Sequence, residues 1–180
     1  FDDMAALGDA SVGMVGALNH TNVPIVAATV GQWVTNTATP LQKVADLNAL
    51  VEGCLTGNKH TIFPDTLLLS SAVYSDVSTT PMSTTGDSSE TVLTFFLKTN
   101  SYIKRVDRWS KLDTAGAAGV DRCMVYKKSK EVISIIEPQP FEQLPPQPKN
   151  LGFEVPTHAR HGGVKVVYPF GMSYMDDLAG

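Results

Sequence analysis

The sequence predicts an α+β fold, and three observations support this prediction. An amphipathic helix is expected over residues 40–56, helices and strands alternate from there to about residue 130, and the last third is rich in β-type runs. The chain has 180 residues, of which 43% are hydrophobic. That composition provides enough apolar surface to offset the conformational entropy lost on folding, so a disordered chain is excluded.

The helix over residues 40–56 is the longest element that the pattern predicts. Thr39 is placed to cap its N-terminus, Pro40 suits the first helical position, and Gln42 completes a capping box. Gly57 stands where the helix should end. Apolar residues recur with the helical period on one face. Those that we expect to be buried against the C-terminal sheet are Leu47, Val51 and Cys54.

Shorter elements are expected on either side of this helix. The glycine-rich opening, residues 7–20, predicts a loop with one short irregular turn. After the helix, capping and turn residues bound each further element. These elements are a buried strand over 65–69, a helix from Ser70 and Ser71 through Val77, a helix from a capping box of Asp87 and Glu90 to Asn100, and a strand over 122–127.

The last third of the chain differs in kind. Residues 131–137, 151–157 and 164–168 are β-rich runs with no helical pattern between them, so they predict an antiparallel sheet. Residues 138–148 hold five of the 11 prolines. Because proline fixes φ and removes a backbone donor, these residues predict a stiff, extended segment.

Charge and hydropathy exclude some classes of function. Lys and Arg number 14 against 18 Asp and Glu, a net charge of -4, which leaves no basic footprint for sequence-independent binding to a nucleic acid. The longest apolar runs, such as 132–136, fall far short of the roughly 20 residues of a membrane-spanning helix. Charged residues make up only 18%. Two interpretations fit this low share of charged residues. Much of the surface is covered by neighbouring subunits, or the surface is exposed but neutral and rich in hydroxyl groups, and composition alone favours the second.

No motif predicts catalysis, and no cofactor is expected. The glycines at 8, 13 and 16 match neither a dinucleotide fingerprint nor a P-loop, and no G-x-S-x-G is present. Cys54 and Cys123 are expected to be reduced core residues. His158 and His161 form an H-x-x-H, but side chains three apart on a strand point to opposite faces, so a metal site is not expected. The acidic pairs at 2–3 and 176–177 are expected to be solvated.

Two segments are candidates for contacts with other molecules. Around Tyr102, basic and aromatic residues interleave, which fits either a phosphate- or base-binding patch or one strand of a mixed surface. Within the proline-rich segment, an aromatic residue fits either a docking contact or packing on its own sheet. The candidate subunit-contact residues are Arg105, Arg108, Trp109, Phe141, Leu144, Pro145 and Pro146.

Taken together, several stretches resemble the major capsid proteins of tailed bacteriophages. They cover most of the chain from Leu7 to about Leu178. The stretches that carry the resemblance are Gly16–His20, Trp33 followed by Thr39-Pro40 and Asp46-Leu47-Asn48, Pro64–Leu69 and, most specifically, Ile135–Gln147 and Val155–Val164.

The resemblance implies the tailed-phage and herpesvirus major capsid fold, in which a spine helix lies on an elongated antiparallel sheet and an axial domain is inserted. Residues 1–65 and 131–180 would form the peripheral domain, with the helix 40–56 as its spine, and 66–130 the inserted axial domain. Family members are normally longer, with an N-terminal arm and an extended loop that clasp adjacent subunits. The chain begins at Phe1 without a signal peptide, so we expect a cleavage product or excised fragment. Compared with the family, we expect it to lack the N-terminal arm and the extended loop, and therefore not to assemble by itself.

The function that the resemblance implies is structural. The protein would form hexamers and pentamers of an icosahedral shell around packaged phage DNA, with scaffold and portal proteins as partners, only non-specific contact with DNA, and no contact with a membrane. It would reside in the virion and assemble in the cytoplasm of the host bacterium. The alternatives are an encapsulin-like nanocompartment shell and a hydrolytic or metal enzyme on an α+β scaffold.

Overall fold

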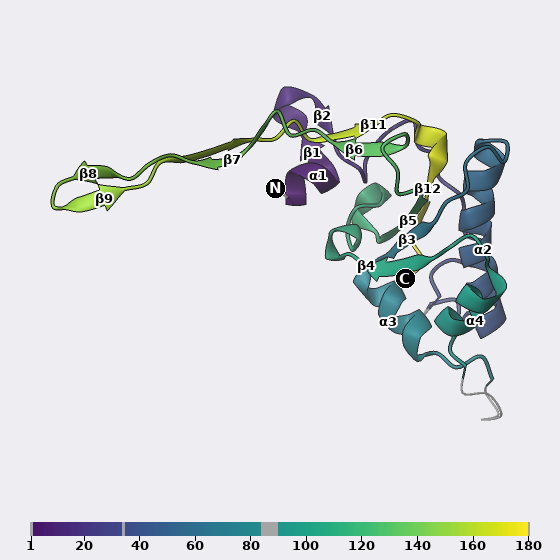
Figure 1. Ribbon diagram of the computed structural model, residues 1–180. Coiled ribbons are helices and arrows are strands. Elements are labelled where there is room, and N and C mark those ends of the chain that lie inside the picture. The colour runs from purple at the N-terminus through teal and green to yellow at the C-terminus, as the bar shows by residue number, and fades with distance from the viewer. Residues whose placement is uncertain (1, 34, 84–89, 180) are drawn as a thin grey trace.

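A four-stranded sheet with the strand order β12-β5-β3-β4 forms the centre of the computed structural model, which describes residues 2–33, 35–83 and 90–179 (Figure 1). Strand β3 (Thr66–Leu69) pairs parallel with β4 (Arg105–Arg108) and antiparallel with β5 (Arg122–Tyr126). Strand β12 (Met172–Asp176) pairs antiparallel with β5. All four residues of β3 are buried, as the sequence predicts for this strand.

Helix α2 (Pro40–Gly57) confirms the helix that the sequence predicts. The hydroxyl of Thr39 accepts from the backbone N–H of Gln42, and the side chain of Gln42 accepts from the backbone N–H of Thr39, so the capping box is complete. The three residues expected in its core, Leu47, Val51 and Cys54, are buried. The helix packs against β12, a strand outside the runs that were predicted to form the C-terminal sheet, and also against β5 and α4 (Val92–Thr99).

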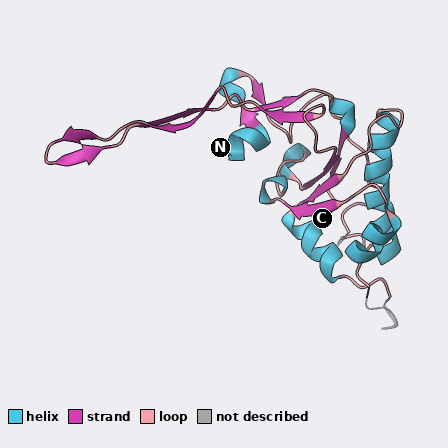
Figure 2. Ribbon diagram, in the orientation of Figure 1, coloured by secondary structure: helices cyan, strands magenta, loops and turns pink. Residues whose placement is uncertain are grey.

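Helix α4 packs against α2, and helix α3 (Ser71–Thr79) packs against α4 (Figure 2). Ser70 caps α3 as predicted, with its hydroxyl accepting from the N–H of Val73. The N-cap of α4 is Thr91, whose hydroxyl accepts from Thr94, so the predicted capping box with Glu90 is wrong; its other member, Asp87, lies outside the described residues. Thr91, which directly precedes the apolar run, places its oxygen over the free N–H groups of the first turn.

The N-terminal segment is more ordered than the single irregular turn that the sequence predicts. It contains α1 (Asp2–Leu7) and a small hairpin of β1 (Gly8–Asp9) and β2 (Met14–Val15). Ala6 is fully buried where α1 meets the C-terminal part of the chain. Long-range packing therefore stabilises a helix too short to form by itself. The four 3-10 turns of the described chain are Ala10–Val12, Ser110–Leu112, Ala117–Gly119 and Pro169–Gly171.

The last third forms antiparallel pairs, as predicted, but they follow one another along a single hairpin. The hairpin leaves the body and extends far from it (Figure 1). Residues 137–162, called the long hairpin below, make up the projecting part; the projection itself was not predicted. The successive pairs are β6 (Ile133–Ile135) with β11 (Val164–Val166), β7 (Gln139–Gln143) with β10 (Thr157–Arg160), and β8 (Gln147–Lys149) with β9 (Gly152–Glu154).

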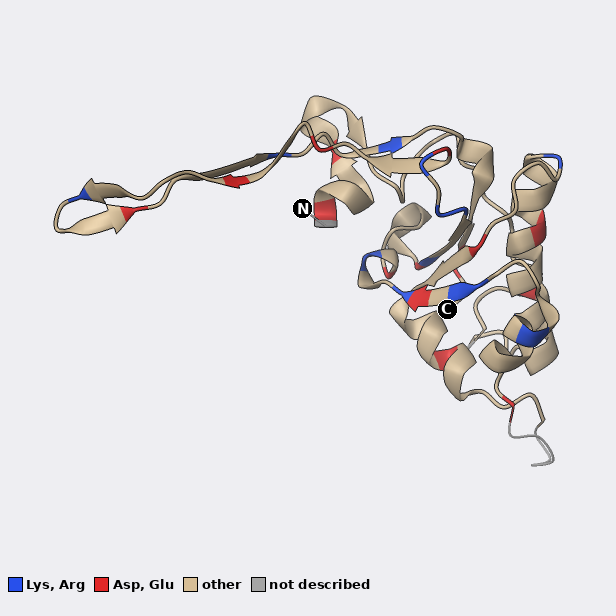
Figure 3. Ribbon diagram, in the orientation of Figure 1, with Lys and Arg blue, Asp and Glu red and all other residues tan. Residues whose placement is uncertain are grey.

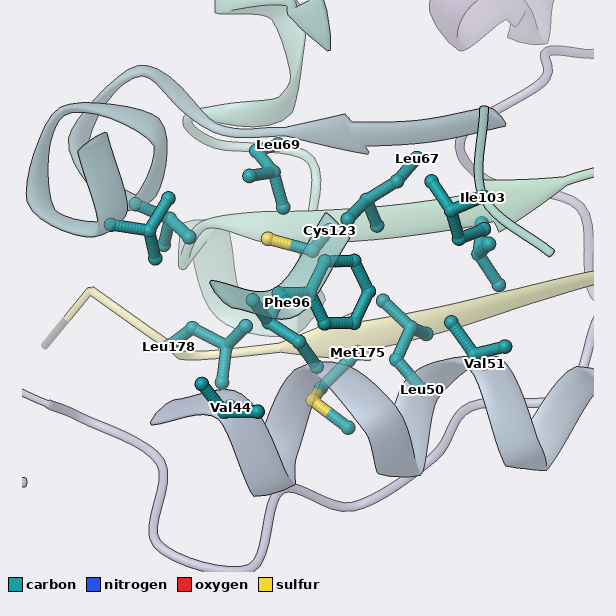
Figure 4. Packing of buried hydrophobic residues seen from close by; sticks show 14 of the residues in the cluster. Val44, Leu50, Val51, Leu67, Leu69, Phe96, Ile103, Cys123, Met175 and Leu178 are labelled. Atoms are coloured by element: carbon teal, nitrogen blue, oxygen red, sulfur yellow. The ribbon is translucent and has the colours of Figure 1, made fainter. Parts of the chain in front are cut away.

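The main core lies between α2 and the sheet. Leu50 on α2 faces Met175 of β12, and Phe96 of α4 closes the same cluster (Figure 4). Leu67 and Cys123 join it from the central strands. The boundaries expected at residues 65 and 130 therefore do not separate two cores, because β12 completes the sheet of β3 and β5. The assignment of peripheral and axial domains stays a prediction.

Candidate self-assembly surfaces

The long hairpin exposes large apolar side chains away from the body. Phe141 is 70% exposed and Phe153 is 78% exposed. Leu151, at the tip, is fully exposed. Its few charged residues are spaced along it (Figure 3), and Lys149 pairs with Glu154 near the tip. A water-exposed ladder of two strands is marginally stable by itself, so this element is suited to gaining stability from a contact.

A two-residue turn of Asn150 and Leu151 closes the hairpin between Lys149 and Gly152. Both residues have positive φ, 47° for Asn150 and 64° for Leu151. This is the backbone that tight hairpins prefer, because its twist matches that of the flanking strands. Asparagine tolerates this conformation, whereas a leucine side chain is strained in it.

The histidines of the long hairpin pair with carboxylates across the ladder and do not converge on each other. Nε2 of His158 lies 3.4 Å from a carboxylate oxygen of Glu142, and Nδ1 of His161 lies 4.0 Å from Glu137. In the part of the chain that the structure describes, no group of three His, Cys, Asp or Glu side chains could hold a metal ion. The two histidines of the H-x-x-H therefore lie along one strand side of the long hairpin, each beside a carboxylate of the opposite strand side.

The predicted contact residues lie on two separate surfaces. Phe141, Leu144, Pro145 and Pro146 are all exposed on the long hairpin. The other three belong to the body: Arg105 and Arg108 on β4, and Trp109 directly after it.

Strand β4 forms one edge of the central sheet, and three of its four side chains are charged. Arg105 makes an ion pair with Asp107 on the same strand, which gives the mixed surface that was one of the two interpretations of this segment. Charged side chains on an edge strand oppose uncontrolled pairing with another chain. Trp109 is half-buried and packs against the second core cluster, formed around Leu112 and Met124.

An apolar groove of about 480 Å³ lies at the base of the long hairpin. Sequence reasoning missed it, because its walls come from segments far apart in the chain. Ala5 and Ala17 line it from the N-terminal segment, and Lys128 and Lys130 are exposed among its residues. The larger lining side chains are Trp109, Met124, Tyr126, Ile133, Ile135 and Val164.

An acidic cavity of about 340 Å³ lies at the other end of the sheet, beside the start of α3. Burial is the main cause that raises the pKa of Asp121 above its usual range, and the nearby Asp177 adds to the shift. The carboxylate of Asp121 accepts from the hydroxyl of Ser70 at 3.2 Å and from the N–H of Ala179 at 3.1 Å. These bonds hold the C-terminal segment against α3, which is a structural role.

The two cysteines are free and buried, as predicted. Burial raises the pKa of Cys54 to about 12 and also raises that of Cys123. Because the thiolate is the nucleophilic form, neither side chain is activated for catalysis.

The expectation that the C-terminal acidic pair is solvated is wrong for Asp176. Its carboxylate makes a two-pronged ion pair with the buried Arg122, with Nε to Oδ1 at 2.6 Å and NH2 to Oδ2 at 2.7 Å. The guanidinium also lies 4.6 Å from the centre of the Tyr174 ring. The reason is tertiary: β12 pairs with β5 and brings the two charges together, although Asp176 stands four positions from the last residue.

Comparison with known proteins identifies the family. A family model described as "Major capsid protein" matches residues 1–178. The chain belongs to this major capsid protein family. Its fold is similar to "The capsid of Myoviridae Phage XM1", with a TM-score of 0.81 and 15% identity. That match covers 98% of this chain and 60% of the phage chain, so the capsid-family chain described here spans about three fifths of that relative.

A second solved structure shares the fold more distantly. The chain is similar to a virus-like particle from Pyrococcus furiosus, with a TM-score of 0.57 and 10% identity, over 84% of this chain and 56% of the other. A comparison with curated proteins finds no match. The resemblance to tailed-phage capsid proteins and the α+β capsid fold are both confirmed. Among the described residues of this family member, no helix is long and apolar enough to cross a membrane.

Proposed function

We propose that the protein is the structural subunit of an icosahedral shell that encloses packaged phage DNA. The family match over residues 1–178 is the observation that carries this proposal. The fold supports it, since nearly the whole chain superimposes on a phage capsid subunit. The long hairpin supports it further, because Phe141 and Phe153 are exposed on it and pack in neither core cluster of the body.

Self-association into hexamers and pentamers is the arrangement that we propose, with scaffold and portal proteins as transient partners and assembly in the host cytoplasm. The candidate subunit contacts are the hairpin residues Phe141, Leu144, Pro145 and Pro146 and the sheet-edge residues Arg105, Arg108 and Trp109. Prolines in the hairpin support this choice, since a preorganised segment loses less entropy on docking. The net charge of -4 supports contact with DNA that is only non-specific.

Imaging of particles from the full-length parent of this chain, together with an assay of nuclease-protected nucleic acid, tests the shell function. We expect closed particles of uniform size whose interior protects DNA when the phage genome is present. A protein that stays monomeric in the infected host would contradict the proposal. The expectation that these 180 residues do not close into shells alone stays a prediction; sedimentation should then show monomers or small oligomers.

A shell that encloses cargo proteins is the second candidate. It is favoured by one observation, the similarity to a virus-like particle from Pyrococcus furiosus. The contents of purified particles distinguish the two shells: co-purifying protein without DNA would support the compartment. The family supports a structural role and not an enzymatic one. Turnover of a substrate that is lost on chelation would be needed to support the metal-enzyme alternative.

A further inference from the structure

Strand β6 has one edge that is paired and one that is open. Among the residues that the structure describes, it pairs with β11 alone, at the base of the long hairpin (Figure 1). In an antiparallel ladder, hydrogen-bonded pairs alternate with pairs that are not bonded. The N–H of Ile136 donates to the carbonyl of Gly163 at 2.9 Å, and the N–H of Val167 donates to the carbonyl of Val132 at 2.8 Å. Even-numbered residues of β6 therefore bond toward β11, and odd-numbered residues face the opposite edge.

The open edge offers three backbone groups to a partner. By this alternation, the N–H and the carbonyl of Ile135 and the carbonyl of Ile133 point away from β11, and none of them has another hydrogen bond within the described chain. The N–H of Ile133 donates to the carbonyl of Ser129 at 3.0 Å, so the open edge begins directly after this turn. Ile135 is 55% exposed. An extended peptide that joins β6 as a further strand would bond to all three groups.

Other strand edges of the protein are protected, and this one is not. Strand β4 carries charged side chains on its edge. The edge of β12 is covered by the segment before α2, because the N–H of Val26 donates to the carbonyl of Tyr174 and the N–H of Tyr174 to the carbonyl of Pro24. Prolines remove donors from β7 and β8. Strand β6, of sequence Ile-Ser-Ile, has no charge and no proline, so its edge is suited to strand addition.

The apolar groove of about 480 Å³ at the base of the long hairpin borders this edge. Ile133 and Ile135 line the groove, and their side chains share one face of β6. Ser134 lines it as well, although its side chain belongs to the other face, so the groove reaches the backbone of the strand. Every second side chain of an added strand would therefore lie over the groove, whose floor includes Trp109 and Met124.

The charge beside the groove favours an acidic partner. Lys128 and Lys130 are exposed and line the groove, on the turn that leads into β6. Their neighbour Lys127 lies 3.4 Å from a carboxylate oxygen of Asp65, whereas neither Lys128 nor Lys130 forms an ion pair within the described residues. The single carboxylate of this turn, Glu131, is exposed and also forms none there. Two lysines against one glutamate leave a positive charge that a partner's carboxylates would complement.

We propose that the open edge of β6 binds an extended, acidic peptide segment of a partner protein by strand addition. Alternate apolar side chains of the segment fill the groove, and its carboxylates lie beside Lys128 and Lys130. The proposal rests on the proposed shell function for the class of partner, a protein that is bound during assembly and later leaves. Three backbone bonds and a short edge make a weak contact, which suits a transient partner.

Selection from a displayed library of random linear peptides against the 180-residue chain tests the site, with amide hydrogen exchange as the readout. We expect selected peptides in which apolar residues alternate with Asp or Glu, and slower exchange of the Ile135 amide in their presence. The fluorescence of Trp109 should shift, while Trp33, which is 2% exposed, provides a constant background. If no selected peptide slows exchange at Ile135, the proposal is overturned.

Ile135→Pro and Ile135→Ala form a matched pair of variants. Both remove the isoleucine side chain, but only proline removes the outward N–H and places a ring where the added strand would lie. Proline is tolerated on an edge strand whose N–H faces solvent, so the ladder with β11 should persist. We expect the selected peptide to bind Ile135→Pro about tenfold more weakly than Ile135→Ala, or weaker still. Equal affinities would overturn strand addition, and if Ile135→Pro fails to fold, the exchange at Ile135 in the unchanged protein decides.

The lysines are tested together. Lys128→Gln combined with Lys130→Gln should weaken binding of the selected peptide about tenfold at low salt and reduce its dependence on salt. The control combines Lys59→Gln with Lys165→Gln, which removes two exposed lysines that do not line the groove. Equal loss of affinity in both double variants would overturn the role of the groove lysines.

Binding of the peptide to the chain alone separates this site from the shell function. DNA-filled particles from the full-length parent, together with no peptide that engages β6, would overturn strand addition and leave the shell function intact. A peptide that engages β6 in a protein whose parent never forms particles would do the opposite. Exchange at Ile135 that slows with protein concentration alone would show pairing between two copies and overturn the acidic partner.

Discussion

Asp46 is a buried carboxylate that holds the loop before α2 in place. It accepts from the backbone N–H of Thr29 at 2.6 Å and from the indole Nε1 of Trp33 at 2.9 Å. The N–H groups of Val30 and Gly31 also donate to it, each at 3.3 Å. Because four donors converge on one side chain without exposure to water, the loss of that side chain leaves them unsatisfied.

Replacing Asp46 with alanine should lower the free energy of unfolding by about 2–4 kcal/mol. The reason is that the buried N–H donors lose their charged acceptor and stay away from water without a hydrogen bond. Urea denaturation measures the change. Asp107→Ala is the matched control, because its carboxylate is partly exposed on the sheet edge. This substitution should lower the free energy of unfolding by about 0.5 kcal/mol or less. Similar midpoints for Asp46→Ala and Asp107→Ala would show that the loop does not depend on Asp46.

Asp121 should make stability depend on pH. Its pKa is raised in the folded protein from the ordinary 3.8, chiefly by burial. As pH rises above 3.8, the unfolded chain ionises first, so the folded state loses stability until the pH exceeds the raised pKa. Below 3.8 the carboxyl is protonated in both states and this effect vanishes.

Asp121→Asn removes that titration while it keeps an oxygen that can accept from the N–H of Ala179. Relative to the unchanged protein, the variant should therefore gain stability as pH rises from acidic to neutral. Chemical denaturation at several pH values measures the difference between the two proteins. A difference that is constant with pH, or that shrinks as pH rises, would contradict this prediction.

At the scale of the element, α2 is the helix on which the core depends. Its buried face meets β5 and β12, and the hydroxyl of Ser173 on β12 donates to the carbonyl of Leu50 at 2.8 Å. The ion pair of Lys43 with Asp76, at 2.6 Å, joins the same helix to α3. The helix therefore connects elements from the middle and from the end of the chain.

Leu47→Ala should destabilise the protein by roughly 2–5 kcal/mol, because the fully buried leucine leaves a cavity that its neighbours fill only in part. Val51→Ala should act in the same direction with a smaller effect. Thermal melting measures both, with Leu41→Ala as the exposed control on the same helix. Unchanged melting of both buried variants would show that this face is not the core.

At the scale of the whole molecule, the body and the long hairpin are expected to be independent in folding. The hairpin residues between 139 and 160 pair with one another, and both core clusters lie in the body. Strands β6 and β11 mark where the hairpin begins, with Ile135 opposite Val164.

In the full-length parent of this chain, replacing residues 137–162 by a short Asn-Gly turn should therefore leave the melting temperature of the body nearly unchanged while it abolishes particle formation. Circular dichroism and sedimentation of the same preparation measure the two effects. If the shortened protein fails to fold, the hairpin contributes to the core; if it still forms closed particles, the hairpin is not needed for the shell.

The sequence by itself determined the elements whose signals are local. Thr39, Pro40 and Gln42 specify the start of α2 within four residues, and the buried run at 66–69 specifies a central strand. These predictions succeed because capping bonds and hydrophobic periodicity act between residues close together in the chain. The family could be identified from the sequence too, through stretches such as 135–147.

Only the tertiary structure decided which distant segments meet. The pairing of β12 with β5 joins Arg122 to Asp176, and the groove draws its walls from the N-terminal segment, β5 and the base of the hairpin. The proline-rich run predicts an extended segment, but whether that segment lies on a sheet or projects from the body depends on the register of strands far apart in sequence. Local propensity carries no information about such pairings, because their free energy comes from side chains that meet only after folding.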